Sequence, residues 1–402
     1  MRIRMLTLRS ISTLLCAALL LAVTTVSIAA TPSTISADTS AEYPFAAAEG
    51  SLALDCQSAI LMDATTGTVL YTQNADQALP PASVTKIMTL LLVMEAIDRG
   101  TLQLSDPVSV SERAASMGGS QVYLEFREVM SCEDMLKSVI ISSANDAAVA
   151  LAEHVAGSLD AFVQRMNERA AELGMQNTHF ENATGLDDTA QNHLTSARDI
   201  TIMSRALIAH PKILEYSSIW MDTIRNGTFG LTNTNRLVRF YRGATGLKTG
   251  STDKAGFCVS VTAERDGMSL ICVIMGAQTR DIRNAQATKL LDWGFANFAC
   301  YTSPSPNLKP IPACGGEIDT CPLESLTFSC IIPKNRLSEI CVETELPTNV
   351  SAPIKKGDKI GTFIYKLGDC ILGETAIVAQ EDVPRISFFT LWKRMFSAIL
   401  LP

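Results

Sequence analysis

The sequence predicts a mixed α/β fold of the α+β type: a domain with a central antiparallel sheet and a helical region, followed by a small β-rich domain. Short β-type runs lie early in the chain, at 58–63 and 68–72, and two longer runs lie late, at 256–263 and 268–276. The segment between them has the apolar spacing that is typical of helices. After residue 300, Pro, Gly and Cys become more frequent and further β-type runs follow. Strands from both ends of the first domain are therefore expected to form one sheet.

The first two strands lead into a central helix. Thr65-Thr66-Gly67 between the strands is a hairpin signal, and Pro80-Pro81 marks a break after them. Residues 82–99 have a helical pattern and are apolar on almost every side. Because a helix that is apolar all round belongs inside a large domain, we expect this one in the middle of the core. Gly100 provides the stop that commonly follows a helix.

Four further helices are expected before the late strands, at 133–141, 146–156, 159–173 and 197–209. The last of these is entered through Thr195 or Ser196, which suit an N-cap, and ends before Pro211. One more helix is expected after the late strands, at 284–298.

The two late strands read as a hairpin around Asp266-Gly267, a strong short-range turn signal. With a two-residue loop, the predicted facing pairs are Arg265–Met268, Val261–Cys272 and, unless a bulge intervenes, Cys258–Met275. Cys258 and Cys272 therefore do not face each other.

The second domain is expected from 300 to 384, with β-type runs that include 326–331 and 359–365. Six of the chain's cysteines fall there: Cys300, Cys314, Cys321, Cys330, Cys341 and Cys370. An even number of cysteines in an exported protein favours disulfides, so one to three bridges are expected in this domain. Free buried thiols are the alternative, above all in the first domain. No Cys-x-x-Cys or His-rich spacing predicts a metal site, and no cofactor is expected.

Residues 1–30 have the pattern of a cleavable export signal. Arg2, Arg4 and Arg9 precede a short apolar run, and small residues at 27–30 offer a cleavage site. The apolar run is shorter than the roughly 20 residues that a membrane-spanning anchor needs. Residues 31–50 are rich in Ser, Thr and Ala and are expected to be a linker.

The charge of the chain excludes one class of partner. Removal of the leader with its three arginines takes the net charge from −8 to −11. Binding to nucleic acid depends on Lys and Arg that neutralise phosphates, and no basic stripe is present. Nucleic acid is therefore not expected as a partner.

Residues 385–402 are expected to form an amphipathic membrane-anchoring helix. On a helical projection, one arc holds Ser387, Thr390, Lys393, Arg394 and Ser397, and large apolar residues fill the rest. The segment is too short to span a bilayer, but Trp and Phe opposite a cationic edge suit the membrane interface. A helix docked on the protein's own surface is the alternative.

The first candidate motif is Ser83-Val84-Thr85-Lys86, at the start of the central helix. A separation of three places Ser83 and Lys86 one turn apart on the same helix face. A serine hydroxyl needs an adjacent base to act as a nucleophile, and a desolvated lysine of lowered pKa can serve. Alone the motif is weak, because an N-cap serine followed by a surface lysine looks the same and Ser251-Thr252-Asp253-Lys254 repeats the pattern.

Two further motifs carry groups that suit a peptide substrate. Ser143-Ala144-Asn145 lies between two expected helices and offers a hydroxyl to relay protons and an amide to hold a peptide group. A loop with an N-cap is the alternative for this motif. Lys248-Thr249-Gly250 leads into the late hairpin and offers an ammonium beside a hydroxyl for a carboxylate. Its glycine lets a substrate backbone approach the strand edge.

In this order the three motifs resemble those of the penicillin-recognising serine enzymes. The flanking residues 80–86, 143–147 and 246–250 are similar to those of the D-alanyl-D-alanine carboxypeptidases, which are low-molecular-mass penicillin-binding proteins. The resemblance runs from about residue 53 to the C-terminus and implies a β-lactamase/transpeptidase-like first domain. It implies removal of the terminal D-alanine from peptidoglycan stem peptides, by a protein that is secreted or lies at the outer face of the bacterial cytoplasmic membrane.

The resemblance also implies a role for each motif residue. Ser83 forms the acyl-enzyme, Lys86 accepts the proton of Ser83, and Ser143 relays a proton to the leaving amine. The implied substrate-binding residues are Asn145, Lys248, Thr249, Gly250, Ser251 and Arg283. Backbone N–H groups of Ser83 and Ser251 are expected to form the oxyanion hole. β-Lactams mimic the substrate and are expected to acylate Ser83.

The chain departs from the family pattern at two positions. Ala144 stands where many relatives have Gly, and Thr234 stands where some have Arg, so an auxiliary contact made by that arginine is not carried over. His193 precedes a helix cap and is expected to be structural.

Two alternative functions are weighed against the carboxypeptidase. A β-lactamase is disfavoured because residues 146–247 contain no Glu-x-x-Leu-Asn segment, which would activate water. A catalytically weak penicillin-binding sensor or scaffold is disfavoured because all three motifs are intact.

Overall fold

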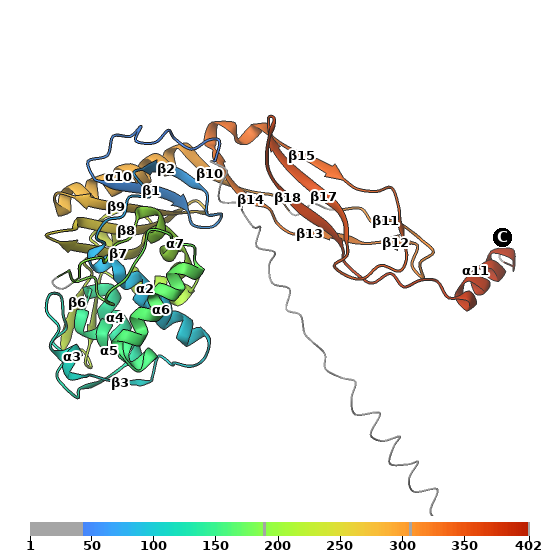
Figure 1. The fold of residues 1–402 in the computed structure, drawn as a ribbon. Coiled ribbons are helices and arrows are strands. Elements are labelled where there is room, and N and C mark those ends of the chain that lie inside the picture. The colour runs from blue at the N-terminus through green and yellow to red at the C-terminus, as the bar shows by residue number, and fades with distance from the viewer. Residues whose placement is uncertain (1–42, 188–189, 305–307, 401–402) are drawn as a thin grey trace, which may run out of the picture. The chain divides into compact units, whose positions relative to one another are not determined.

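The computed structural model describes residues 43–187, 190–304 and 308–400. The leader at 1–30 and most of the linker at 31–50 lie outside the described residues. The first part of the chain is built on a five-stranded sheet with the order β2-β1-β9-β8-β7 (Figure 1). These strands are β1 (Ser58–Asp63), β2 (Val69–Gln73), β7 (Ala244–Thr252), β8 (Gly256–Arg265) and β9 (Met268–Ala277). All neighbouring strands are antiparallel, which confirms a central antiparallel sheet with strands from both ends of this region.

The Lys248 motif was expected at a strand edge, but the bounds of the strand β7 were not predicted. Its sequence mixes Gly and Thr with a lysine and lacks the alternation of apolar and polar residues that marks a strand. It lies at the edge of the sheet, next to β8, and the short 3-10 helix η1 (Ala82–Thr85) packs against it. Residues 246–250 are buried, and the short helices at 211–217 and 237–240 also pack against this strand.

The predicted hairpin of β8 and β9 is confirmed at its turn end and wrong at the other. Arg265 pairs with Met268 and Val261 pairs with Cys272, as expected. The register then shifts between Phe257 and Val259, so Cys258 does not face Met275. A bulge adds a residue on one strand and changes every pairing beyond it, which the sequence did not reveal.

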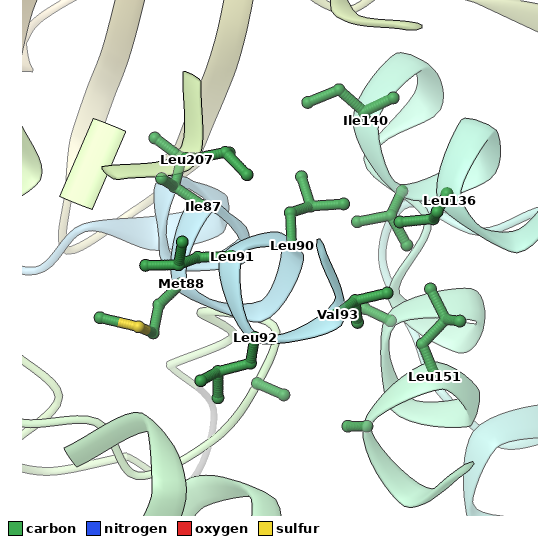
Figure 2. Close-up of a cluster of buried hydrophobic side chains, with 14 of the residues drawn as sticks. Ile87, Met88, Leu90, Leu91, Leu92, Val93, Leu136, Ile140, Leu151 and Leu207 are labelled. Atoms are coloured by element: carbon green, nitrogen blue, oxygen red, sulfur yellow. The ribbon is translucent and has the colours of Figure 1, made fainter. Parts of the chain in front are cut away.

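The central helix α2 (Lys86–Asp98) is buried on nearly all sides, as predicted. The helices around it are α4 (Cys132–Ser142), α5 (Asn145–Ala156), α6 (Leu159–Glu172) and α7 (Ala197–Ile208). Figure 2 shows side chains of α2 pointing outward in several directions toward Leu136, Ile140, Leu151 and Leu207. Alternate residues of the central strands face this helical cluster, whereas those between them face α10 (Arg280–Asn297) on the other side of the sheet.

Replacement of Leu90 by alanine is expected to lower the free energy of unfolding by about 2–5 kcal/mol. Leu90 has no exposed surface and lies in the core between α2 and α4. The loss comes from the apolar surface no longer buried and from the cavity that remains. Urea unfolding followed by circular dichroism measures it. Leu326→Ala is the control, because Leu326 is 59% exposed and should change stability by less than about 0.5 kcal/mol.

Short elements complete the first part of the chain. They are β3 (Pro107–Ser109), α3 (Glu112–Ala115), β4 (Val129–Ser131), α8 (Pro211–Ser217), β5 (Met221–Ile224), β6 (Phe229–Thr232) and α9 (Leu237–Phe240). The strands pair as two separate two-stranded ribbons, β3 with β4 and β5 with β6.

The C-terminal part is rich in strands, as predicted. A two-stranded sheet joins β10 (Phe298–Thr302) to β14 (Ser329–Pro333). A three-stranded sheet joins β11 (Ile311–Cys314), β12 (Thr320–Cys321) and β16 (Val350–Ser351). A four-stranded sheet contains β13 (Leu323–Ser325), β15 (Ile340–Glu345), β17 (Lys359–Leu367) and β18 (Cys370–Ala379). This part has its own apolar core, in which Phe328 stacks on Tyr365 with the ring centroids 4.1 Å apart.

The expectation of disulfides in the C-terminal part is wrong for this structure: all ten cysteines of the described residues are free. Cys300 on β10 faces Ile331 and Cys330 on β14 faces Tyr301. Since successive residues of a strand point to opposite faces of the sheet, these two thiols lie on different faces. The position of Cys300 and Cys330 on neighbouring strands therefore does not bring their sulfur atoms together.

The C-terminal segment forms the helix α11 (Phe388–Leu400). Its large apolar side chains are exposed: Phe388, Phe389, Leu391, Trp392, Met395 and Phe396. Among the described residues, no helix has the length and apolar character needed to cross a membrane.

Candidate active site

Ser83 lies on a strained turn that two glycines, Gly185 and Gly250, approach closely. The residue before it, Ala82, has φ +48°, a left-handed conformation that few non-glycine residues adopt. A Cβ on Gly250 of β7 would lie 2.8 Å from the backbone nitrogen of Ser83, and one on Gly185 would lie 1.8 Å from the carbonyl oxygen of Ala82. Both neighbours must therefore be glycine for the turn to fit. The packing holds Ser83 at the edge of the sheet.

Lys86 is fully buried and directs its amine at Ser83. Its Nζ donates to the Ser83 Oγ at 2.9 Å and to the Thr184 carbonyl at 2.8 Å. Burial lowers the pKa of Lys86 well below its ordinary value, and the nearby charge of Lys248 lowers it further, against an opposite effect of Asp146. A neutral amine within hydrogen-bond reach of a hydroxyl is able to accept its proton.

Ser143 and Asn145 lie where α4 ends and α5 begins. Ser143 has φ +62° at the C-cap of α4, lines the same cleft as Ser83 and is only 4% exposed. The Nδ2 of Asn145 donates to the Gly118 carbonyl at 2.7 Å. The Oδ1 of Asn145 is buried and has no partner, so it is able to accept a hydrogen bond from a ligand. Asp146 accepts hydrogen bonds from the backbone N–H groups of the neighbouring loop at 122 and 124.

Lys248 and Thr249 belong to β7. The Nζ of Lys248 is buried and donates to the Thr249 carbonyl at 3.0 Å. Burial, and secondly the charge of Arg283, lowers the pKa of Lys248 to about 7. The Thr249 hydroxyl donates to the Thr234 hydroxyl at 2.9 Å, so the residue that departs from the family pattern lies in the site and contacts its threonine.

Arg283 lies in the first turn of α10 and is 3% exposed. It donates to the Asn284 Oδ1 at 2.9 Å and to the Cys258 carbonyl at 3.4 Å. Burial, followed by the charge of Arg280, lowers its pKa to about 10, so it stays positively charged near neutral pH. Arg283 therefore adds a cation on the Thr249 side of the cleft.

One cleft of about 560 Å³ collects these groups. The predicted residues that line it are Ser83, Ser143, Thr249, Gly250, Ser251 and Arg283. Lys86 is connected to this cleft through its hydrogen bond to Ser83, and the backbone N–H of Asn145 donates to the carbonyl of Ser120, which lines the cleft, at 2.7 Å. Lys248 adjoins Thr249. All nine candidate residues therefore meet in one region. The described residues contain no cluster of side chains that could hold a metal ion.

The second Ser-x-x-Lys pattern has a different geometry. Lys254 is exposed and its Nζ donates to the Asp187 carbonyl at 3.1 Å, not to Ser251. Ser251 lines the cleft without a lysine as partner. Ser83 is thus the serine with a buried base beside it.

Several site residues were not predicted from the sequence. The carbonyl of Thr184 accepts from Lys86, and Ser120, Trp220, Arg236, Phe240 and Arg280 line the cleft. His193 was expected to be structural; its Nε2 lies 2.7 Å from the Thr85 Oγ1, within the first motif, and its Nδ1 accepts from the Glu181 N–H at 3.0 Å. A lone histidine that is far in sequence from Thr85 gives no local signal of this contact.

Comparison with known proteins agrees with this geometry. The family profile described as D-alanyl-D-alanine carboxypeptidase matches residues 44–279, and that of the penicillin-binding protein 5 C-terminal domain matches residues 322–385. The chain is 41% identical over 350 residues to the D-alanyl-D-alanine carboxypeptidase DacF of Bacillus subtilis, covering 85% of this chain and 90% of that protein.

Solved structures give the same result. The chain resembles penicillin-binding protein 5 from Haemophilus influenzae with a TM-score of 0.72 and 32% identity, covering 83% of this chain and 98% of that one. It also resembles penicillin-binding protein D2 from Listeria monocytogenes in the ampicillin-bound form, with a TM-score of 0.56 and 34% identity over 61% of this chain and 99% of that one. The family predicted from the three motifs is confirmed: the chain belongs to the D-alanyl-D-alanine carboxypeptidases, the serine peptidases among the low-molecular-mass penicillin-binding proteins.

Proposed function

We propose that the protein removes the terminal D-alanine from peptidoglycan stem pentapeptides through an acyl-enzyme on Ser83. The observation that carries this proposal is the buried Lys86 amine, 2.9 Å from the Ser83 hydroxyl, in a cleft also lined by Ser143 and Thr249. This arrangement supplies a nucleophile, its base and a second hydroxyl within one cavity.

The reaction follows from these positions. The Ser83 Oγ attacks the carbonyl between the two D-alanines, and neutral Lys86 takes the hydroxyl proton. Backbone N–H groups of Ser83 and Ser251 stabilise the oxyanion. The carbon–nitrogen bond then breaks, and Ser143 passes to the leaving amine the proton that Lys86 took up, which leaves Lys86 neutral again. Water attacks the acyl-enzyme and gives up a proton to Lys86, and this proton returns to the Ser83 Oγ as the shortened peptide leaves.

Substrate binding divides between two sides of Ser83. On the acyl side, the unpartnered Oδ1 of Asn145 accepts from a peptide N–H of the substrate. On the leaving-group side, Lys248, Thr249 and Arg283 bind the terminal carboxylate. Gly250 and Ser251 offer the edge of β7 to the substrate backbone. Two cations and a hydroxyl beside one carboxylate make charge-assisted hydrogen bonds, which are stronger than neutral ones.

β-Lactams are proposed to acylate Ser83 in the same cleft. The ampicillin-bound relative supports this proposal, since its fold and family are shared. The sensor or scaffold alternative predicts labelling by a fluorescent penicillin without release of D-alanine from a pentapeptide. A β-lactamase would turn over the penicillin instead of retaining it. The test is to measure both labelling and D-alanine release; release of D-alanine supports the carboxypeptidase, and its absence from well-labelled protein contradicts it.

The cellular location of the protein is proposed from its N-terminal and C-terminal segments. Residues 1–30 are proposed to be a cleaved export signal and 31–50 a linker. The catalytic domain spans 51–299, the β-rich domain 300–384, and the anchor 385–402. The exposed aromatic side chains of α11 support binding to a membrane surface. The protein would then act at the outer face of the bacterial cytoplasmic membrane, or as a secreted enzyme if the helix does not bind.

The rate of D-alanine release is expected to fall as the pH rises through about 7, because Lys248 has its pKa near that value. Its ammonium form binds the carboxylate, and deprotonation removes that attraction from the free enzyme. In Lys248→Arg the guanidinium stays protonated, so this limb of kcat/KM should move up by more than about one pH unit. A pH profile of both proteins measures the shift. An unchanged limb in Lys248→Arg would assign it to another group.

A further inference from the structure

The cleft beside Ser83 has lining residues that the proposed reaction does not use. Besides Thr249 and Arg283, which are proposed to bind the terminal carboxylate, the lining includes Trp220, Arg236, Phe240 and Arg280. The whole cleft measures about 560 Å³, a size that pockets for drug-sized ligands have.

Two of these lining residues carry positive charges without an acidic partner. Arg236 and Arg280 are exposed, and neither takes part in an ion pair among the described residues. Both guanidinium groups are near enough to Arg283 to lower its pKa, so the three cations act on one region. Asp281 is the acid that opposes them there. Three like charges beside one another repel, and an anion between them relieves this repulsion.

The wall between these arginines is aromatic. Trp220 and Phe240 meet edge to face with the ring centroids 6.2 Å apart, and Phe240 is 71% exposed. The indole Nε1 of Trp220 is buried without a hydrogen-bond partner. The Arg239 guanidinium lies over both rings, 5.4 Å from the centroid of Trp220 and 5.5 Å from that of Phe240. The surface of Phe240 that remains exposed offers apolar contact to the aliphatic part of a ligand whose ends are polar. An apolar stem that ends in an anion fits this wall and its arginines.

We infer that Arg236 and Arg280 form a second anion subsite, for a leaving group that is larger than D-alanine and carries a second carboxylate. The inference rests on the proposed function, because it names a further substrate class of the same site. The first carboxylate binds Lys248, Thr249 and Arg283, and the second reaches Arg236 and Arg280. The bond broken is the same carbon–nitrogen bond; water supplies the hydroxyl of the new acid and a proton ends on the leaving amine.

A dicarboxylic D-amino acid at the end of a stem peptide supplies a leaving group of this chemistry. Its first carboxylate is on the carbon that bears the leaving amine, and its second carboxylate is at the end of the side chain.

The test compares diacetyl-Lys-D-Ala-X substrates in which X is D-Ala, D-Glu or the uncharged isostere D-Gln. The wild-type protein is expected to prefer D-Glu over D-Gln by roughly fivefold in kcat/KM at low salt, since two partly exposed charge pairs contribute. The preference should shrink as salt is added, because exposed charges are screened.

The double variant Arg236→Gln/Arg280→Gln is expected to bring the D-Glu to D-Gln ratio close to one. The ratio cancels any change that affects both substrates, and labelling by a fluorescent penicillin shows that the variant has folded. Arg242→Gln is the matched control, an exposed arginine near Arg236 that is outside the cleft lining; it should keep the wild-type ratio. A wild-type ratio near one, or a ratio that the double variant leaves unchanged, overturns the subsite. Loss of D-Ala release in the wild-type protein would instead contradict the proposed function.

Discussion

Ser83→Ala is expected to abolish both labelling by a fluorescent penicillin and release of D-alanine. The substitution removes the only oxygen that the buried Lys86 amine contacts on this turn, at 2.9 Å, and with it the atom that forms the acyl bond. Removal of a covalent nucleophile typically costs several orders of magnitude in rate. Gel fluorescence after penicillin treatment and an enzyme-coupled D-alanine assay measure the two effects.

Ser251→Ala is the matched control, because Ser251 also begins a Ser-x-x-Lys pattern and lines the same cleft. Its lysine, Lys254, donates to a backbone carbonyl instead. Ser251 would contribute its backbone N–H, which alanine retains, so labelling should persist. Labelling that survives in Ser83→Ala and disappears in Ser251→Ala would move the nucleophile to the second motif.

Lys86→Met is expected to slow acylation by at least about a thousandfold while the protein remains folded. The methionine fills a similar volume without an amine, so the Ser83 hydroxyl loses its base. Because Lys86 is fully buried and its pKa is lowered mainly by that burial, an apolar side chain removes a desolvation cost. The unfolding temperature should therefore stay level or rise.

A time course of penicillin labelling together with a thermal melt separates the two effects. Lys254→Met supplies the control, since Lys254 is exposed and its loss should leave the labelling rate within about twofold. If Lys86→Met labelled at the wild-type rate, another group would have to accept the proton. If Lys86→Met were labelled slowly and also melted at a much lower temperature, the main role of Lys86 would be to stabilise the fold.

The sequence predicted those parts of the site that depend on local spacing. Ser83 and Lys86 meet because a separation of three residues is one helical turn, whatever surrounds them. The central helix was recognisable because its residues are apolar on every side. Arg283 and the Lys248 motif required family resemblance, since their position beside Ser83 depends on how β7 and α10 are placed in the fold.

Other parts of the site had no signal in the sequence. The Thr184 carbonyl that holds Lys86 is a backbone group, which every residue has. Arg236 and Arg280 come from different segments and become neighbours only when α9 and α10 are folded. The expected pairing of Cys258 failed because a bulge in the strand is a backbone feature. A disulfide between Cys300 and Cys330 does not form because their thiols lie on opposite faces of the sheet.

The first residue of α2 is Lys86, and this helix is buried on nearly all sides. The turn that carries Ser83 therefore continues directly into the core, and it keeps its conformation as long as the core stays folded. Heat or urea should extinguish penicillin labelling at the same point at which the whole domain melts. Substitutions that displace this turn in order to weaken acylation by β-lactams would also misfold the domain. Substitutions at the rim of the cleft would not have this cost.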